Sequence, residues 1–472
     1  MSPRRLWTLA LTGVAAFMVT LDALVVITAL PNIGRRLNVS LDALQWTVNA
    51  YTLAFAAGII TAAAVADRFG RRRLFAAGLV LFALSSAACA LAPSASVLIG
   101  ARVIQGLSAA LVAPVALTIL TSAFPPERRG AVTGLYGGVA GLAVASGPLV
   151  GGALTELFGW HAVFWINVPV GLAAAILSLV HLPETFGPRT RLDPLGTLLV
   201  SSGAVGLILG LVRATGSGWA SPDTLLYLGV GGVSMAAFIG WELRVHDPML
   251  PMRLFASLAF SASNSTAFFV TAAQFAAAFL IAQYFQLALG YSPLETGLRI
   301  LPWSATPLFV APLAGVLSDK IGRRPLMLVG MLLQAGGFVA FALMAGTGAT
   351  YWQAVTALVV AGVGVSMVLP VAPAAVMSAV AVPDMGRASA VNTMLQRFGS
   401  AFGVAVATAV FSASGNLTSA AAFTEGLRPA LLVIAALSAL GAVTAVGVVE
   451  RRRSSGRIAL AVEPATSLGI AA

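Results

Sequence analysis

The sequence has very little that binds metals or forms disulfides. It contains one cysteine, Cys89, and three histidines, His161, His181 and His246, which lie far apart. A single cysteine excludes an intramolecular disulfide and a cysteine-based metal site, and scattered histidines match no metal-ligand spacing. No nucleotide-binding loop and no Ser/His/Asp arrangement is present either. We therefore expect no metal, no other cofactor and no enzymatic activity.

Charge is also scarce. Only 9% of the residues are charged and 59% are hydrophobic, whereas a typical soluble domain has about 25% charged residues. The apolar residues form blocks of about 20 or more, the length that crosses a hydrocarbon core of about 30 Å. The first block continues from Leu6 to about Leu30, too long for the apolar region of a signal peptide. The chain is therefore expected to be a multi-pass membrane protein with an uncleaved first span.

The blocks predict an all-α integral membrane protein with about fourteen transmembrane helices. The expected spans are 6–30, 45–66, 74–92, 96–120, 131–154, 162–182, 194–213, 224–243, 259–289, 296–318, 325–346, 351–380, 388–413 and 427–449.

The basic residues orient these spans. With the N-terminus inside, twenty of the 27 Lys and Arg residues fall on inner connectors or tails, five on outer connectors and two, Arg102 and Arg397, within spans. Cytoplasmic loops carry such an excess of basic residues. The net charge of +11 is thus read as an orientation signal and does not indicate a nucleic-acid partner. We expect a cytoplasmic-membrane protein with both termini in the cytoplasm.

An internal repeat divides the chain. Residues 63–72, which contain Asp67-Arg68-Phe69-Gly70-Arg71, are matched by residues 315–324, which contain Asp319-Lys320-Ile321-Gly322-Arg323. Eight predicted spans separate the copies, so a six-helix repeat leaves two additional helices between the halves. The predicted units are an N-terminal six-helix bundle (1–192), two inserted helices (193–253), a C-terminal six-helix bundle (254–449) and a cytoplasmic tail (450–472).

Several motifs in order give the chain a resemblance to the major facilitator superfamily, and within it to the fourteen-helix drug:proton antiporter group. The motifs lie at Leu21–Pro31, Asp67–Arg73, Arg102–Gly106, Gly134–Gly152, Gly159–Pro169 and Asn392–Gly399. Four positions depart from the usual pattern. Ala63 and Ala143 replace glycine, His161 replaces arginine, and Gln396 and Arg397 stand in changed order.

The resemblance implies a secondary transporter of the multidrug efflux type, which exports amphiphilic drugs or antibiotics in exchange for protons by alternating access of two bundles. It implies gating residues in the repeated turn, namely Asp67, Arg68, Gly70, Arg71, Asp319, Gly322 and Arg323. It also implies a hinge or seal in the antiporter motif, at Gly134, Gly147, Pro148, Gly151 and Gly152. Generic helix packing is the alternative for the glycines, and an orientation signal or lipid headgroup binding is the alternative for the arginines.

Asp22 is the only acidic residue well inside a predicted span. A carboxylate at the centre of a membrane helix costs about 2.5–3.5 kcal/mol, so it normally faces a cavity or a partner and marks function. Burial favours the neutral acid, which allows proton uptake and release. Arg102 is expected at about the same depth and is the predicted partner in proton coupling. The alternatives are a structural hydrogen-bonding role for Asp22 and an Arg102 that reaches headgroups or backbone carbonyls.

A substrate cavity is expected between the bundles. Its candidate lining residues are Trp46, Asn49, Gln105, Phe268, Gln274, Gln283, Trp303 and Arg397, although such residues also serve in ordinary packing. The expected partners are an amphiphilic small molecule, protons and membrane lipids, with the monomer as the functional unit. Export of one particular metabolite or antibiotic, proton-coupled import and a membrane protein with no transport role remain as alternatives.

Overall fold

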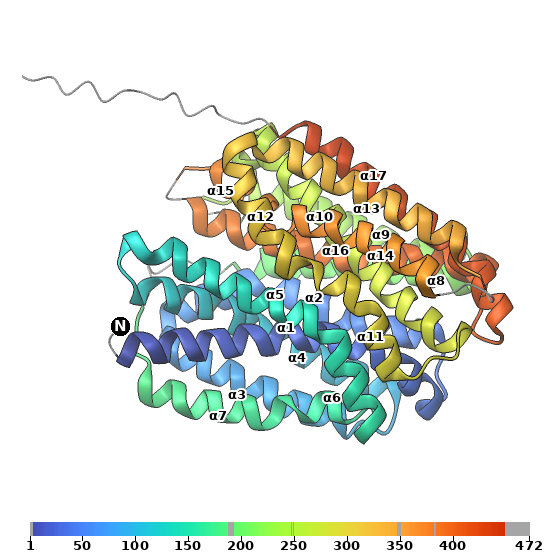
Figure 1. The fold of residues 1–472 in the computed structure, drawn as a ribbon. Coiled ribbons are helices and arrows are strands. Elements are labelled where there is room, and N and C mark those ends of the chain that lie inside the picture. The colour runs from blue at the N-terminus through green and yellow to red at the C-terminus, as the bar shows by residue number, and fades with distance from the viewer. Residues whose placement is uncertain are drawn as a thin grey trace, which may run out of the picture.

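The computed structural model describes residues 3–186, 193–246, 248, 250–346, 351–381 and 384–448, and this part of the chain is helical without any strand (Figure 1). The predicted tail, 450–472, lies outside the described residues. The helices are α1 (Pro3–Leu37), α2 (Leu41–Phe69), α3 (Arg71–Ala90), α4 (Ala95–Ala123), α5 (Pro126–Phe158), α6 (Ala162–Trp165), α7 (Asn167–His181), α8 (Pro194–Ser217), α9 (Pro222–Glu242), η1 (Met252–Ala256), α10 (Leu258–Gln283), η2 (Tyr284–Ala288), α11 (Pro293–Ser304), α12 (Thr306–Ile321), α13 (Arg323–Met344), α14 (Tyr351–Val368), α15 (Val371–Ser378), α16 (Met385–Ser414) and α17 (Ala420–Val446).

The predicted all-α membrane fold is confirmed. Within the described residues, 13 helical stretches are long and apolar enough to cross a membrane. The 29-residue helix α2 also has the necessary length. Large apolar side chains such as Leu84, Phe309 and Leu343 remain 58%, 71% and 72% exposed, as expected for helices whose outer faces contact lipid.

Three expected spans are broken into two helices each, and proline accounts for the breaks because it lacks a backbone N–H. Pro169 lies in the first turn of α7, directly after the break from α6. Pro302 and Pro307 flank the break between α11 and α12, and Pro370 precedes α15. The break at Ile166 matters for function, because it places Asn167 at the start of α7.

The helices form two packed groups. In Figure 1, α1 to α7 lie in the lower group and α10 and α12 to α17 in the upper group, with α11 reaching down beside the lower group. The principal contacts between the groups are those of α5 with α11 and of α2 with α16. The helices α8 and α9 pack on each other, and α8 packs against α2 and α16; a hydrogen bond of 2.6 Å joins Thr61 in α2 to Thr197 in α8. The division into two moving bundles and an inserted pair stays a prediction.

In both copies of the repeated turn, a glycine with a positive φ joins the two helices. Gly70 joins α2 to α3 with a φ of 107°, and Gly322 joins α12 to α13 with a φ of 96°. These left-handed values strain any residue with a Cβ, which explains glycine at both positions of the repeat.

Candidate functional site

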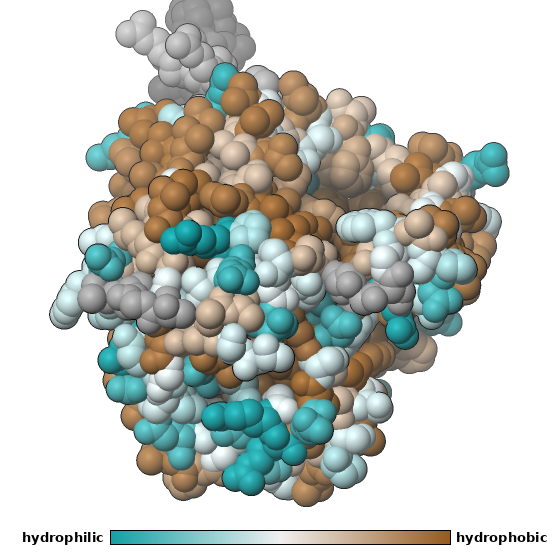
Figure 2. Space-filling model, turned by 90° about the vertical axis from the view of Figure 1, so that its right-hand side faces the viewer, coloured by the Kyte–Doolittle hydropathy of each residue, from teal (hydrophilic) through white to brown (hydrophobic). Residues whose placement is uncertain are grey.

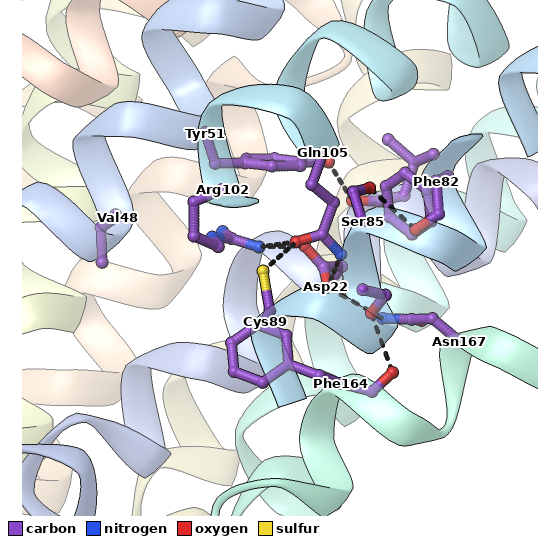
Figure 3. A network of polar contacts seen from close by, with 12 residues as sticks. Asp22, Val48, Tyr51, Phe82, Ser85, Cys89, Arg102, Gln105, Phe164 and Asn167 are labelled. Carbon is purple, nitrogen blue, oxygen red and sulfur yellow. Dashed lines mark hydrogen bonds and ion pairs between the residues drawn. The ribbon is translucent and has the colours of Figure 1, made fainter. Parts of the chain in front are cut away.

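Asp22 lies at the centre of a buried polar network in the lower helix group (Figure 3). Its Oδ2 accepts a hydrogen bond of 2.5 Å from Nη1 of Arg102 in α4, and the two side chains are 0% and 1% exposed. Its Oδ1 accepts from Nε2 of Gln105 at 2.9 Å and from Nδ2 of Asn167 at 2.8 Å. Two helices besides α1 thus hold this carboxylate, since α4 supplies two donors and α7 supplies the third from its first residue.

Arg102 is itself held in place from α2. Its Nε donates to the carbonyl oxygen of Thr47 at 3.1 Å, and its guanidinium carbon lies 4.2 Å from the centre of the Tyr51 ring. The Tyr51 hydroxyl donates to the Val19 carbonyl of α1 at 3.0 Å. The positive charge of Arg102 is therefore paired with a carboxylate and an aromatic ring, and its N–H groups donate to protein oxygens, as a buried cation requires.

A second layer of hydrogen bonds fixes the amides around the carboxylate. Asn167 also donates to Ser86 Oγ at 3.1 Å, and Ser86 donates to the Phe164 carbonyl at 2.8 Å. The Cys89 thiol donates to Oε1 of Gln105 at 3.4 Å. A carboxylate saturated by donors in a dry site is stabilised in its ionised form, whereas burial itself favours the neutral acid. Two opposing effects therefore act on the Asp22 carboxyl: the donors favour its ionised form, and burial favours its neutral form.

The sequence placed Asp22 and Arg102 together and assigned Gln105 to the substrate cavity; the structure puts Gln105 beside the carboxylate instead. Asn167, Tyr51, Ser86 and Cys89 were missed as members of the network. The available signals were the Gly159–Pro169 motif around Asn167 and the position of Cys89 inside a span, but neither says which way a side chain points.

A small, mostly apolar cavity lies between the two helix groups, with about 30 Å³ open to the centre of a water-sized sphere. This is far below the roughly 300–1,000 Å³ of a small-molecule site, so the cavity is nearly closed in this conformation. Of the eight predicted cavity residues, Gln274 of α10 and Trp303 of α11 line it, and Pro148 of α5 lines it as well. The indole N–H of Trp303 is buried without a hydrogen-bond partner among the described residues. An unpaired buried donor beside a cavity is a group that a ligand can satisfy.

The other predicted cavity residues do not line this cavity. Gln283 donates to the Phe279 carbonyl of its own helix, Phe268 packs against Phe269 and Phe402, and Arg397 contacts the Phe55 ring. Trp46 packs at the edge of an apolar cluster, and the Asn49 amide is buried without a partner among the described residues.

The two groups are held together at the ends of α5 and α11, in a contact defined by Pro148, Gly152, Glu156, Ser292 and Gly297. We call it the outer seam, because the predicted orientation puts this end of the helices on the outer side. A Cβ at Gly152 would lie 2.9 Å from the Pro293 carbonyl carbon, and a Cβ at Gly297 would lie 2.9 Å from the Cα of Leu149. Glu156 Oε2 accepts from Ser292 Oγ at 2.5 Å and from the Leu294 amide at 2.9 Å. Figure 2 presents the end of the molecule to the right of Figure 1, where hydrophilic residues gather among apolar ones.

The other glycines of the antiporter motif differ from one another. Gly147 and Gly151 pack against α1, at Leu24 and at Val25 and Thr28. Gly134 has open space where a Cβ would lie. Close helix approach is thus a property of the C-terminal half of the motif.

The first copy of the repeated turn carries a compact ion-pair cluster. Asp67 accepts from Arg71 at 2.8 Å, and Arg68 lies over the Phe69 ring. Glu184, which follows α7, accepts from the Arg72 backbone amide at 2.9 Å and fills the space beside Gly70. In the second copy Arg323 donates to Ser378, and Asp319 has no hydrogen bond or ion pair within the described residues. The two copies of the turn therefore have a glycine of positive φ in common, but their charged side chains contact different residues.

Comparison with known proteins finds matches over most of the chain. The Major Facilitator Superfamily profile matches residues 12–271 and 263–469. The chain is 35% identical to the multidrug resistance protein Stp of Mycobacterium tuberculosis over 415 residues, which cover 88% of this chain and 77% of that protein. It is 34% identical to the puromycin resistance protein pur8 of Streptomyces alboniger over 439 residues, or 91% and 86% of the two chains. It is 37% identical to the tetracenomycin C resistance and export protein of Streptomyces glaucescens over 330 residues, or 70% and 61%.

Solved structures agree on the fold. A bacterial homologue of the human lysosomal transporter Spinster, in an inward-facing and occupied conformation, superposes with a TM-score of 0.69 at 19% identity and covers 94% of this chain and 97% of its own. A peptide transporter of the POT type in complex with sulfate gives a TM-score of 0.67 at 17% identity, with 94% and 96% coverage.

Proposed function

Since the chain belongs to the Major Facilitator Superfamily and is a multi-pass membrane transport protein, we propose that it exports amphiphilic drugs or antibiotics across the cytoplasmic membrane in exchange for protons. The names of its relatives, a multidrug resistance protein and two antibiotic resistance or export proteins, support this substrate class. The proposal that export is coupled to protons rests on the buried hydrogen-bond network around Asp22.

In the proposed cycle Asp22 takes up a proton from the outer side and releases it inside. Protonation removes the negative charge that Arg102, Gln105 and Asn167 surround. Arg102 then becomes an uncompensated buried cation, which is unfavourable. Rearrangement of α1 against α4 and α7 relieves it, and this links the proton to the conformation of the lower group.

Substrate and proton are proposed to be coupled through alternating access of the two groups about the cavity, with both termini in the cytoplasm and a single chain as the working unit. α1 has a part in both sites, because Asp22 lies in the network and Leu24, Ile27 and Thr28 line the cavity. A shift of α1 caused by protonation would therefore change the cavity directly. The outer seam would close the cavity from the outside and would have to open once per cycle.

The test uses everted membrane vesicles that contain the protein. A proton gradient is preset, lipophilic dyes and antibiotics are added one at a time, and the internal pH is followed. Substrates should dissipate the gradient and accumulate in the vesicles. If no member of the panel does so, the drug-antiporter proposal fails.

A second candidate is a dedicated exporter of one antibiotic. Two of the relatives carry the name of a single compound, and the small apolar cavity is lined by few polar groups. In the same vesicle panel this candidate predicts that one compound, and not several, dissipates the gradient.

Trp303 is expected to contact the substrate. Replacing it with Ala should weaken export of aromatic substrates about tenfold, because stacking and an unpaired N–H donor are both lost. Trp352, which is 77% exposed, provides the matched control, and Trp352→Ala should leave the apparent affinity unchanged. Concentration dependence of dye efflux measures both. Equal effects of the two substitutions would exclude a specific role for Trp303.

Asn167 is expected to set the proton affinity of the Asp22 site. Asn167→Ala removes one of the donors that stabilise the ionised carboxylate, so the pH profile of export should shift toward higher pH while substrate affinity stays the same. Asn392, a buried asparagine that donates to Asn264 in the upper group, provides the control. Asn392→Ala should leave the pH profile in place. An unshifted profile in Asn167→Ala would reduce its role to packing.

A further inference from the structure

Arg397 is the second arginine predicted within a span, and the proton network does not use it. It lies in α16, which begins at Met385. At 1.5 Å per residue this is about 18 Å from the start of the helix, close to the middle of a hydrocarbon core of about 30 Å. The residue is partly exposed. A cation at this depth normally marks a functional site.

The surroundings of Arg397 differ sharply from those of Arg102. Arg102 has a carboxylate, an amide oxygen and a backbone carbonyl as acceptors. Arg397 has neither a hydrogen bond nor an ion pair to any described residue; its contact is the ring of Phe55, 4.5 Å from the guanidinium carbon. Asp22, the one acid well inside a predicted span, is already bound by three side chains. Arg397 is therefore a positive charge at membrane depth without an acidic partner among the described residues.

The mode of contact leaves Arg397 available for binding. A guanidinium over an aromatic ring uses its flat face, and the N–H groups around its edge remain available. Phe55 is 1% exposed and belongs to α2, in the opposite helix group, so it fixes the arginine at the junction between the groups. An edge with free N–H groups matches a carboxylate or phenolate oxygen, and the charge–charge hydrogen bonds are strong in a dry setting.

We propose that Arg397 is a substrate-binding residue that recognises the anionic group, a carboxylate or phenolate, of an amphiphilic substrate. The inference rests on the proposed export function and deepens it. The Asp22 carboxylate, fully paired and 0% exposed, is closed to a cationic substrate in this conformation, whereas Arg397 offers a charge that a substrate can neutralise. Phe55 supplies an aromatic surface beside that charge. Arg397 does not line the cavity described above, so the proposed site is a separate one, at the contact between α2 and α16.

The test measures binding, so that it does not depend on the proton cycle. The probes are rhodamine B, which carries a free carboxylate, and its ethyl ester, which has the same aromatic body without that charge. Their dissociation constants are measured on the purified, detergent-solubilised protein by fluorescence polarisation. The wild type should bind the acid about tenfold tighter than the ester or better, as expected for a hydrogen bond between charged groups.

Arg397→Gln should remove this preference and keep ester binding, and Arg397→Lys should retain part of it. Arg428→Gln is the matched control, since Arg428 donates to the Ala345 carbonyl elsewhere in the upper group, and its preference should equal that of the wild type. Wild-type protein that binds the acid no tighter than the ester overturns the proposal. So does an Arg397→Gln variant that loses both probes equally. Asp22→Asn should keep the preference even though it abolishes exchange, which separates failure of this inference from failure of the proposed function.

Discussion

Replacement of Asp22 with Asn is expected to reduce substrate-driven proton movement to the level of vesicles without the protein. The amide has the shape of a neutral carboxylic acid and can still accept from Gln105 or Asn167, but it has no proton to exchange. Binding of substrate should persist, because Asp22 is not among the residues that line the cavity. The measurement is the decay of a preset pH gradient in everted vesicles, with dye binding to the same protein as the check on folding.

The partner substitution separates charge from proton. Arg102→Ala also should abolish proton coupling, but for another reason, because a buried carboxylate without its cation is destabilised by about 3–5 kcal/mol and will remain protonated. Its stability should fall accordingly. The double variant Asp22→Asn/Arg102→Gln removes both charges, so it should recover stability and remain inactive in exchange. Gradient-driven export by Asp22→Asn would disprove the role of this carboxylate, and unchanged coupling in Arg102→Ala would remove the pairing as its basis.

The sequence was sufficient for the parts of this site that depend on depth alone. A lone acid and one of the two arginines within spans, each placed by counting residues from a helix end, were expected at one level, and Asp22 and Arg102 do meet there. Helix spans and the repeated Gly70 and Gly322 turns followed in the same way, from hydropathy and from a local motif.

Features that depend on rotation and on breaks in the helices were not predictable. Asn167 is separated from Asp22 by 145 positions, and its side chain reaches the carboxylate only because the sixth span breaks at Ile166. The predicted cavity list mixed residues on several helix faces, so Gln274 and Trp303 line the cavity while Trp46 and Gln283 do not. A pattern of polar residues gives their depth, but the packing of neighbouring helices decides which way they point.

Replacement of Gly152 with Val is expected to abolish export by preventing closure of the outer seam. The new side chain would meet backbone atoms of Pro293 and Leu294 in the opposite helix group, and backbone cannot move aside as a flexible side chain can. The clash lies between the two groups, so each group should still fold. Gly297→Val, which meets the Pro148 and Leu149 backbone from the other side, should act in the same way.

The state of the seam can be read by cysteine labelling, because Cys89 is the single native cysteine. In a Cys89→Ser background, which keeps a donor to Gln105, a reporter Gln274→Cys places a thiol in the cavity. A membrane-impermeant maleimide added from outside should label it slowly in the parent protein. With Gly152→Val it should react at least about tenfold faster, since an outer end that cannot close stays accessible. Gly141 provides the control on the same helix, because no atom lies within 4 Å of a Cβ there. Gly141→Val should export and label like the parent, and a Gly152→Val protein that does the same would show that the seam does not gate the cavity.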